Sequence, residues 1–138
     1  MSTSAANQFS DGSDQMPASQ FPNILLASDN SRIAKSLQRK LLEEGFAVQL
    51  AAGYHALEVL WQEYRHPVIL LEVSNAHSVD AAVNAAMAIK RHDSSQFVGY
   101  LADPILRTSG LAGDAIFPRN LHRLPAALRM HFSPPSAS

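Results

Sequence analysis

The sequence contains no cysteine. This absence excludes disulfide bonds, thiolate metal sites and cysteine nucleophiles, and it fits a cytoplasmic protein. No stretch has the apolar content of a membrane span, which needs about 20 residues. The first 20 residues have neither the basic start nor the apolar run of a signal peptide. We therefore expect a cytoplasmic chain that does not associate with a membrane.

The sequence also lacks an excess of either positive or negative charge, because the net charge is only −1. No overall field favours nucleic acid or a membrane surface as a partner. The sequence has no phosphate-binding loop, since Gly110 and Gly113 alone are weak signals, and no serine lies in a nucleophile elbow. None of the six histidines forms an i, i+4 metal pair. The sequence thus predicts a protein that is not an enzyme and that holds no cofactor or metal.

The composition divides the 138 residues into one domain and two tails. Residues 1–20 are rich in Ser, Ala, Gln and Asp, which bury little apolar surface, so we predict a disordered N-terminal tail. Residues 133–138 are predicted to form a second disordered tail. Residues 21–132 alternate between β-rich runs and helical periodicity, and we expect them to form a single domain.

Five apolar runs are predicted to be the strands of one parallel sheet. The runs are Asn23–Ser28, Phe46–Leu50, Val68–Val73, Phe97–Leu101 and Ala115–Phe117. Helical segments alternate with these runs, which predicts right-handed crossovers and helices on both faces of the sheet. The expected architecture is a three-layer α/β domain with a five-stranded parallel sheet.

The first helical segment has a recognisable start, stripe and end. Asn30 or Ser31 is expected to cap it, because either side chain can accept a bond from a free first-turn amide. Leu37 and Leu41 lie four residues apart on its apolar stripe. Gly45 tolerates the positive φ that ends a helix. We therefore expect a helix from about residue 31 to residue 44.

Two later helices are less regular. The helix that runs to about His92 is expected to begin at Ser78 or Asp80, because either residue can cap it. The last helix contains Pro125, which removes a backbone hydrogen bond if Asn120 is the cap. Its first turn is therefore expected to be irregular.

The carboxyl edge of the predicted sheet is the place to look for function. Ligands of such folds bind where the strands end, near the switch in strand order. The candidate residues at these ends are Ser28, Asp29, Glu72, Leu101 and Pro118.

Three segments resemble the receiver domain of two-component response regulators, the CheY-like group of flavodoxin-like domains. ILLASDNSRI is similar to the family's first strand and acidic turn, and HPVILLEV is similar to the strand that carries the phosphoacceptor aspartate. LLEEGFAVQLAAGYHALEVL is similar, without gaps, to the family's helix, second strand, glycine turn and next helix. The resemblance covers residues 22–132 and weakens after Leu101. It implies a flavodoxin-like sheet and a role in bacterial signal transduction.

The resemblance also implies which positions would carry phosphoryl transfer. In the family, an aspartate attacks a phosphohistidine while acidic groups hold magnesium beside it. The acceptor position falls on Glu72, and the acidic pair falls on Ser28 and Asp29. One carboxylate is therefore missing, and the longer glutamate would crowd the in-line geometry.

The positions that would sense the phosphoryl group depart further from the family. The hydroxyl position falls on Leu101, the lysine position on Pro118 with Arg119 next to it, and the aromatic switch on Ala115. Without the lysine or the hydroxyl, developing charge would have no fixed cation or donor. The chain between Leu101 and Asp114 is also shorter than the family usually has.

Glu72 and Asp29 each admit more than one interpretation. Glu72 could mimic a phosphorylated state, act as a residual acceptor, or be a polar residue that a nearby backbone amide satisfies; we favour the last. Asp29 could retain a weak magnesium ion together with Glu72. An acid just before Asn30 and Ser31 more often serves the helix N-terminus, which is the interpretation we favour.

Basic residues gather toward the end of the chain. They are Arg107, Arg119, His122, Arg123 and Arg129. A solvated helix face is the default interpretation of such a group. The alternative is a partner-docking face, since receivers commonly signal through their fourth and fifth helices. A homodimer through the altered fourth-helix region is a further alternative.

The sequence therefore predicts a stand-alone pseudo-receiver. Such a protein would be an interaction module of two-component-type signal transduction that binds another signalling protein without being phosphorylated. The first alternative is an atypical but phosphorylatable response regulator of a phosphorelay. The second is a small flavodoxin-like ligand-binding protein, for which no phosphate cradle is found.

Overall fold

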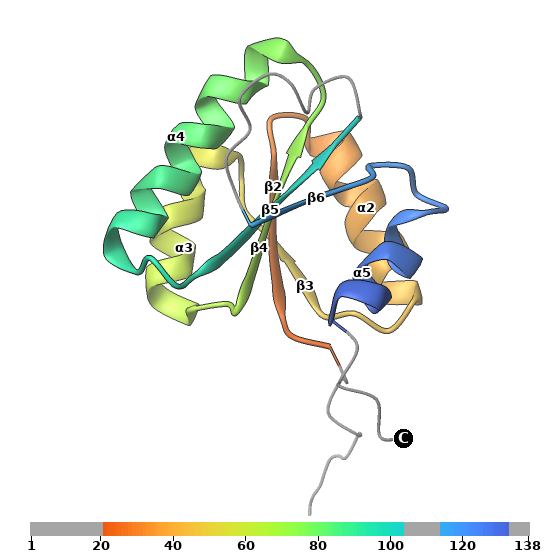
Figure 1. The fold of residues 1–138 in the computed structure, drawn as a ribbon. Helices are drawn as coiled ribbons and strands as arrows, with labels where there is room; N and C mark the ends of the chain where they lie inside the picture. Colours follow the sequence, from red (N-terminus) through yellow and green to blue (C-terminus); the bar gives the residue numbers. More distant parts are fainter. Residues whose placement is uncertain (1–20, 104–113, 133–138) are drawn as a thin grey trace, which may run out of the picture.

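The computed structural model describes residues 21–103 and 114–132. Its centre is a five-stranded sheet with the strand order β3-β2-β4-β5-β6, in which every neighbouring pair is parallel. The strands are β2 (Ile24–Ser28), β3 (Val48–Leu50), β4 (Val68–Val73), β5 (Phe97–Ala102) and β6 (Ala115–Phe117) (Figure 1). The predicted parallel sheet is confirmed, and its strand order is flavodoxin-like.

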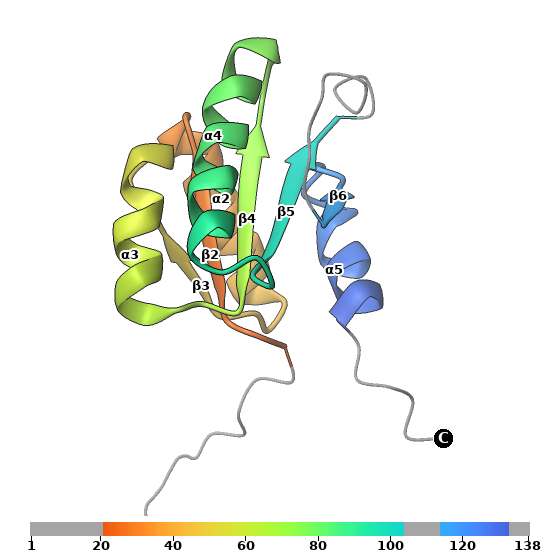
Figure 2. The same cartoon turned by 60° about the vertical axis from the view of Figure 1, so that its left-hand side comes forward.

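Helices cover both faces of this sheet. They are α2 (Ser31–Glu43), α3 (Leu57–Tyr64), α4 (Ala76–His92) and α5 (Leu124–Phe132), and the short 3₁₀ turn η1 (Tyr54–Ala56) precedes α3. Figures 1 and 2 show α2 and α5 on one face and α3 and α4 on the other. The three-layer architecture predicted from the sequence is therefore confirmed.

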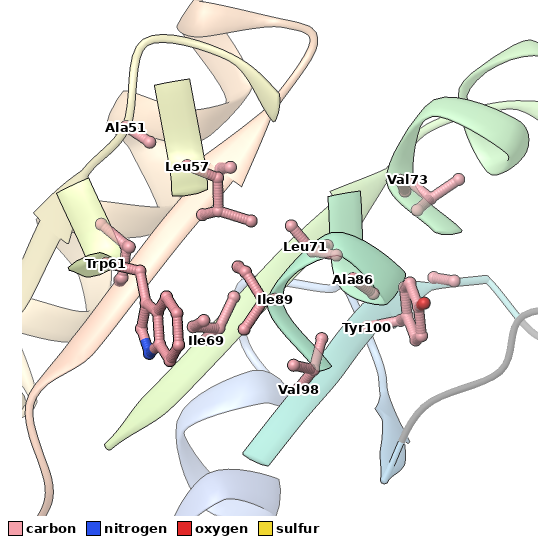
Figure 3. Close-up of a cluster of buried hydrophobic side chains, with 14 of the residues drawn as sticks. Ala51, Leu57, Trp61, Ile69, Leu71, Val73, Ala86, Ile89, Val98 and Tyr100 are labelled. Atoms are coloured by element: carbon pink, nitrogen blue, oxygen red, sulfur yellow. The ribbon is translucent and has the colours of Figure 1, made fainter. Parts of the chain in front are cut away.

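Alternate residues of the central strand β4 supply the two apolar cores. Ile69 and Leu71 belong to the core that α3 and α4 cover (Figure 3). Val68 and Leu70 belong to the core under α2 and α5. Glu72 continues this second series, because side chains of a strand alternate between faces. The strand therefore directs Glu72 toward the α2 and α5 side, at the carboxyl edge of the sheet.

The predicted ends of α2 are confirmed. The Asn30 side chain accepts hydrogen bonds from the backbone N–H of Arg32 at 3.0 Å and of Ile33 at 3.2 Å. These bonds satisfy two of the amides that a helix start leaves without partners. Gly45 follows the helix with a φ of +96°, a conformation that glycine adopts without strain.

The predicted start of α4 is wrong. The helix begins at Ala76, and the side chain of Asn75 accepts a bond from the backbone N–H of Ser78 at 3.2 Å. Asn75 is therefore the cap, and the predicted starts Ser78 and Asp80 both lie inside the first turns. Ser, Asn and Asp, three residue types that can cap a helix, all occur within the seven positions after β4, and the apolar pattern alone did not distinguish them.

The irregular start predicted for the last helix is confirmed. The Asn120 side chain accepts bonds from the backbone N–H of His122 at 2.8 Å and of Arg123 at 3.2 Å. These residues form a turn, and α5 itself begins at Leu124. Pro125 thereby lies in the first turn of the helix, where its missing N–H leaves no bond unmade.

The second strand is shorter than predicted. The prediction began at Phe46, but its backbone N–H bonds to the Leu41 carbonyl at 3.0 Å and so closes the end of α2. The strand starts at Val48 instead. The fourth predicted strand extends one residue further, to Ala102.

Residues 1–20, 104–113 and 133–138 lie outside the described residues. Both predicted tails fall there, as do Arg107 and the shortened segment predicted after Leu101. Within the described ranges, no helix is long and apolar enough to cross a membrane.

Candidate functional site

Two of the predicted site residues lie side by side at the carboxyl edge of the sheet. The register pairs Ser28 of β2 with Glu72 of β4. Ser28 is 4% exposed and Glu72 is 0% exposed, so both side chains are shielded from solvent. The parallel register thus makes a buried polar crevice between two strand ends.

Three other predicted positions bring no polar side chain to this crevice. Leu101 lies beside Glu72 in the sheet and is fully buried in the core under α2 and α5. Ala115 and Pro118 are half-buried at β6 and just after it. These side chains cannot donate a hydrogen bond to an anion.

The carboxylate of Glu72 accepts hydrogen bonds from three side chains. Ser28 Oγ donates to Oε1 at 2.6 Å. Ser74 Oγ lies 2.9 Å from Oε2 and 3.1 Å from Oε1. Arg119 Nε donates to Oε2 at 2.8 Å. The expectation that a backbone amide satisfies Glu72 is therefore wrong, because two hydroxyls and a guanidinium do so.

Arg119 is a cation that the sequence analysis grouped with a basic face, either solvated or open to a partner. Its Nη1 also lies 3.3 Å from Asp103 Oδ2, so the guanidinium spans two carboxylates. Burial opposes its charge, but hydrogen bonding and attraction to Glu72 and Asp103 raise the pKa of Arg119. The expectation that this crevice lacks a fixed cation is wrong. We expected the lysine position to fall on Pro118, and the long side chain of the next residue, Arg119, reaches Glu72.

The Glu72–Arg119 pair meets the conditions under which a buried ion pair is tolerated. Removing two charges from water is costly, and attraction compensates only when the remaining acceptor sites are also bonded. The hydroxyls of Ser28 and Ser74 provide those bonds. The crevice is therefore a complete network made by the chain's own side chains.

Asp29 does not cap α2, contrary to our expectation. Asn30 is the cap, and the Asp29 carboxylate instead accepts a hydrogen bond from the hydroxyl of Ser78 on α4. Ser28 Oγ accepts a bond from the Asn30 backbone N–H at 2.9 Å, which fixes the turn between β2 and α2. Asp29 therefore links the start of α4 to the edge of the sheet.

Tyr54 is a residue of this site that the sequence analysis did not identify. Its hydroxyl donates to the backbone carbonyl of Glu72. Burial, together with the negative charges of Asp29 and Glu72, raises the pKa of Tyr54, so the phenol stays protonated. Gly53 turns the chain just before it with a φ of +87°. The Gly-Tyr pair after the second predicted strand was the available signal.

The side chains of the crevice do not fit the magnesium ion that receiver chemistry uses. Among the residues that the structure describes, no group of three or more His, Asp or Glu side chains could hold a metal ion. Asp29 is exposed, but the oxygens of Glu72 already accept bonds from hydroxyls and from Arg119. A divalent cation at Glu72 would also be repelled by the guanidinium.

The basic residues considered as a possible partner face do not form one patch among those that the structure describes. Arg119 belongs to the crevice, and Arg129 donates to the carboxylate and the carbonyl of Glu44. His122 and Arg123 are exposed at the start of the last helical segment.

Solved structures share this arrangement of strands and helices. Chemotaxis protein CheY4 of Vibrio cholerae matches with a TM-score of 0.65 at 18% identity, over 80% of this chain and 98% of that chain. The fold is that of a response-regulator receiver domain. A response regulator from Thermotoga maritima matches this receiver fold with a TM-score of 0.65 at 12% identity, over 83% of this chain and 99% of that one.

The non-phosphorylated HemR receiver domain of Leptospira biflexa is also similar, with a TM-score of 0.59 at 19% identity over 85% of this chain and 98% of that one. No family model matches the sequence, and no curated protein matches it significantly. Since all three identities are low, these likenesses establish the receiver fold.

Proposed function

We propose that this receiver-fold protein is an interaction module of two-component-type signalling that does not undergo phosphoryl transfer. One observation carries the proposal: the side chain of Glu72 has no exposed surface, and Ser28, Ser74 and Arg119 bond its oxygens. The position that accepts a phosphoryl group in receivers is thus already filled.

Phosphoryl transfer would need a carboxylate oxygen aligned with the incoming phosphorus. Hydroxyls and the Arg119 guanidinium hold both oxygens of Glu72 in place, and burial leaves no path for a phosphohistidine. Leu101 supplies no donor for the charge that would develop in the transition state. These features together disfavour phosphoryl transfer more strongly than any one of them would alone.

The same network favours a constant surface over a switch. Arg119 ties the end of β4, through Glu72, to the end of β5, through Asp103. Charge-assisted bonds of this kind are roughly twice as strong as neutral ones. A domain held in one arrangement would present one face to another signalling protein. The exposed side of α5, where Met130 is 83% exposed, is a candidate for that face.

Incubation with acetyl phosphate and magnesium tests the proposal, with intact-mass spectrometry as the readout. We expect no phosphoryl adduct on the wild type or on Glu72→Gln, while a conventional receiver domain in the same tube becomes labelled. A stable adduct on the wild type that disappears in Glu72→Gln would overturn the proposal.

A phosphorylatable response regulator is the second candidate function, and Arg119 is the observation that favours it. A cation beside the acceptor position can pair with phosphoryl oxygens, provided that Arg119 first leaves Glu72. Calorimetric titration with magnesium separates the two candidates, because a saturable heat that Asp29→Asn abolishes would support the second. Trp61 fluorescence is a poor reporter here, since Trp61 is buried and bonded to Gln96 at the opposite end of the sheet.

A further inference from the structure

A pocket of about 760 Å³ opens beside the acidic crevice, at the carboxyl ends of β2 and β3. Small-molecule sites commonly have volumes of about 300–1,000 Å³, so its size suits a ligand of that class. The pocket shares Ser28 and Asp29 with the crevice. Its other walls come from the first turn of α2, from residues 50–55 and from α4.

Small side chains create this space. Five lining residues are alanine or glycine: Ala34, Ala51, Ala52, Gly53 and Ala81. Ala34 and Ala51 are buried and form an apolar floor, whereas Ala52 and Ala81 are exposed. The pocket therefore offers apolar contact to a ligand without needing a core side chain to move.

Two basic side chains line the pocket without a partner. Neither Lys35 nor His55 makes a hydrogen bond or ion pair within the described part of the chain. The carboxylate of Asp29, by contrast, is held by Ser78. A Cβ on Gly53 would lie 3.0 Å from His55 Nδ1, so the glycine lets the imidazole lie against the turn. The hydrogen bond does not remove the charge of Asp29, so the lining holds one carboxylate engaged by Ser78 and two basic groups open to a ligand.

We propose that this pocket binds a small organic acid. Its apolar body, an aromatic ring or a short acyl chain, would lie on the floor formed by Ala34 and Ala51. Its carboxylate or sulfonate would form an ion pair with Lys35 and accept a hydrogen bond from the imidazole of His55. An uncharged ligand of the same shape would lack this ion pair and would bind more weakly.

The pocket also touches groups that hold Glu72. Ser28 lines it and donates to the Glu72 carboxylate, and Tyr54 lines it and donates to the Glu72 carbonyl. A bound acid would therefore contact the side chains that fix the crevice. This arrangement would give the domain a non-covalent input in the place of phosphorylation.

Titration with 1-anilinonaphthalene-8-sulfonate, an aromatic sulfonate, tests this site on the full folded chain. We expect saturable fluorescence with one probe per chain, and shifts of the Ser31, Lys35 and Gly53 amide signals in NMR spectra. Lys35→Ala should weaken this probe about fivefold. N-phenyl-1-naphthylamine, which has the same rings without the sulfonate, should be unaffected by Lys35→Ala.

Steric and charge controls complete the design. Ala81→Leu adds bulk at an exposed position of the pocket and should weaken both probes. Ala126→Leu and Arg39→Ala alter exposed helix positions that do not line the pocket, and should change neither.

Lack of saturable binding to the folded chain would overturn the inference, as would binding that Ala81→Leu leaves unchanged. Equal weakening of both probes by Lys35→Ala would overturn the assignment of an acid. None of these results depends on whether Glu72 accepts a phosphoryl group. The acetyl phosphate assay therefore tests the proposed function independently of the pocket.

Discussion

At the residue scale, the crevice depends on one carboxylate and the side chains that neutralise it. Glu72 has no exposed surface, whereas the side chain of Arg119 keeps 23% of its surface in solvent. An isolated buried charge would be unstable, so the carboxylate depends on its cation and on the hydroxyls of Ser28 and Ser74. Removing one partner of this pair should therefore cost more stability than breaking an ordinary surface ion pair.

Arg119→Ala is expected to lower the free energy of unfolding by roughly 2–4 kcal/mol, because it leaves Glu72 buried without its cation. Urea denaturation measures the change. Arg123→Ala is the matched control, since Arg123 is exposed, and it should change stability by less than about 0.5 kcal/mol. Adding Glu72→Gln to Arg119→Ala should restore part of the loss. A double variant no more stable than Arg119→Ala would contradict the ion-pair account.

The buried side chain of His66 is expected to make the stability of the domain sensitive to acid. It is 7% exposed, its Nδ1 has no hydrogen-bond partner among the described residues, and burial lowers its pKa. The unfolded chain therefore binds the proton more readily. The contribution of neutral His66 to the free energy of unfolding is complete above a pH of about 6.5. It declines as the pH falls below that value toward the lower pKa of the folded state.

The variant His66→Phe tests this pH dependence. Between pH 7 and pH 5, the free energy of unfolding of the wild type should fall by more than that of His66→Phe. His122→Phe, at an exposed position, should show no such shift. An unchanged difference for His66→Phe across this range would show that the imidazole does not contribute.

At the element scale, a single glutamine joins three parts of the fold at the amino end of the sheet. Gln96 Oε1 accepts a bond from Trp61 Nε1 on α3 at 2.8 Å. Its Nε2 lies 3.0 Å from the carbonyl of His66 and 3.1 Å from that of Pro67, just before β4. Gln96 thus positions α3 against the strands at the end of the domain away from the crevice.

Gln96→Leu is expected to destabilise the domain by about 2 kcal/mol, because it leaves the buried Trp61 N–H without its acceptor and removes the amide donor to three backbone carbonyls. Urea denaturation followed by fluorescence of Trp61, the only tryptophan, provides the measurement. Gln62→Leu, at an exposed position of α3, should have little effect. Equal losses for the two variants would contradict the special role of Gln96.

The elements themselves could largely be predicted, since apolar runs and helical stripes depend on local sequence. Ala115–Phe117 has the predicted bounds, and the turn before Pro125 followed from the missing proline N–H. Boundaries were missed where several signals competed, as at Asn75. The same held at Phe46, whose amide closes a helix instead of joining a strand.

The site could be predicted only in part. Parallel strands bring their carboxyl ends to one edge, so Ser28 and Glu72 could be placed together before any contact was known. The contact of Arg119 with Glu72 could not be predicted. The resemblance put the lysine position on Pro118, and a sequence pattern does not show how far the side chain of the next residue extends. Tyr54 was missed for a similar reason, since its contact is with a backbone carbonyl.

At the scale of the whole molecule, the chain has the receiver fold, and we propose that it lacks the residues of receiver chemistry. Neither of the two apolar cores includes the polar residues Ser28, Asp29, Glu72 and Arg119 at the carboxyl edge. Those groups can therefore change while the fold persists. On the function we propose, the chain's own side chains fill the place that a phosphoryl group and its cation would take.

NMR spectroscopy with magnesium and beryllofluoride, a phosphoryl analogue, tests this central claim most directly. We predict no saturable shift of the amide signals of Ser28, Glu72 and Arg119, because the oxygens of Glu72 are already bonded. A saturable, magnesium-dependent shift of these signals that Glu72→Gln abolishes would contradict the claim.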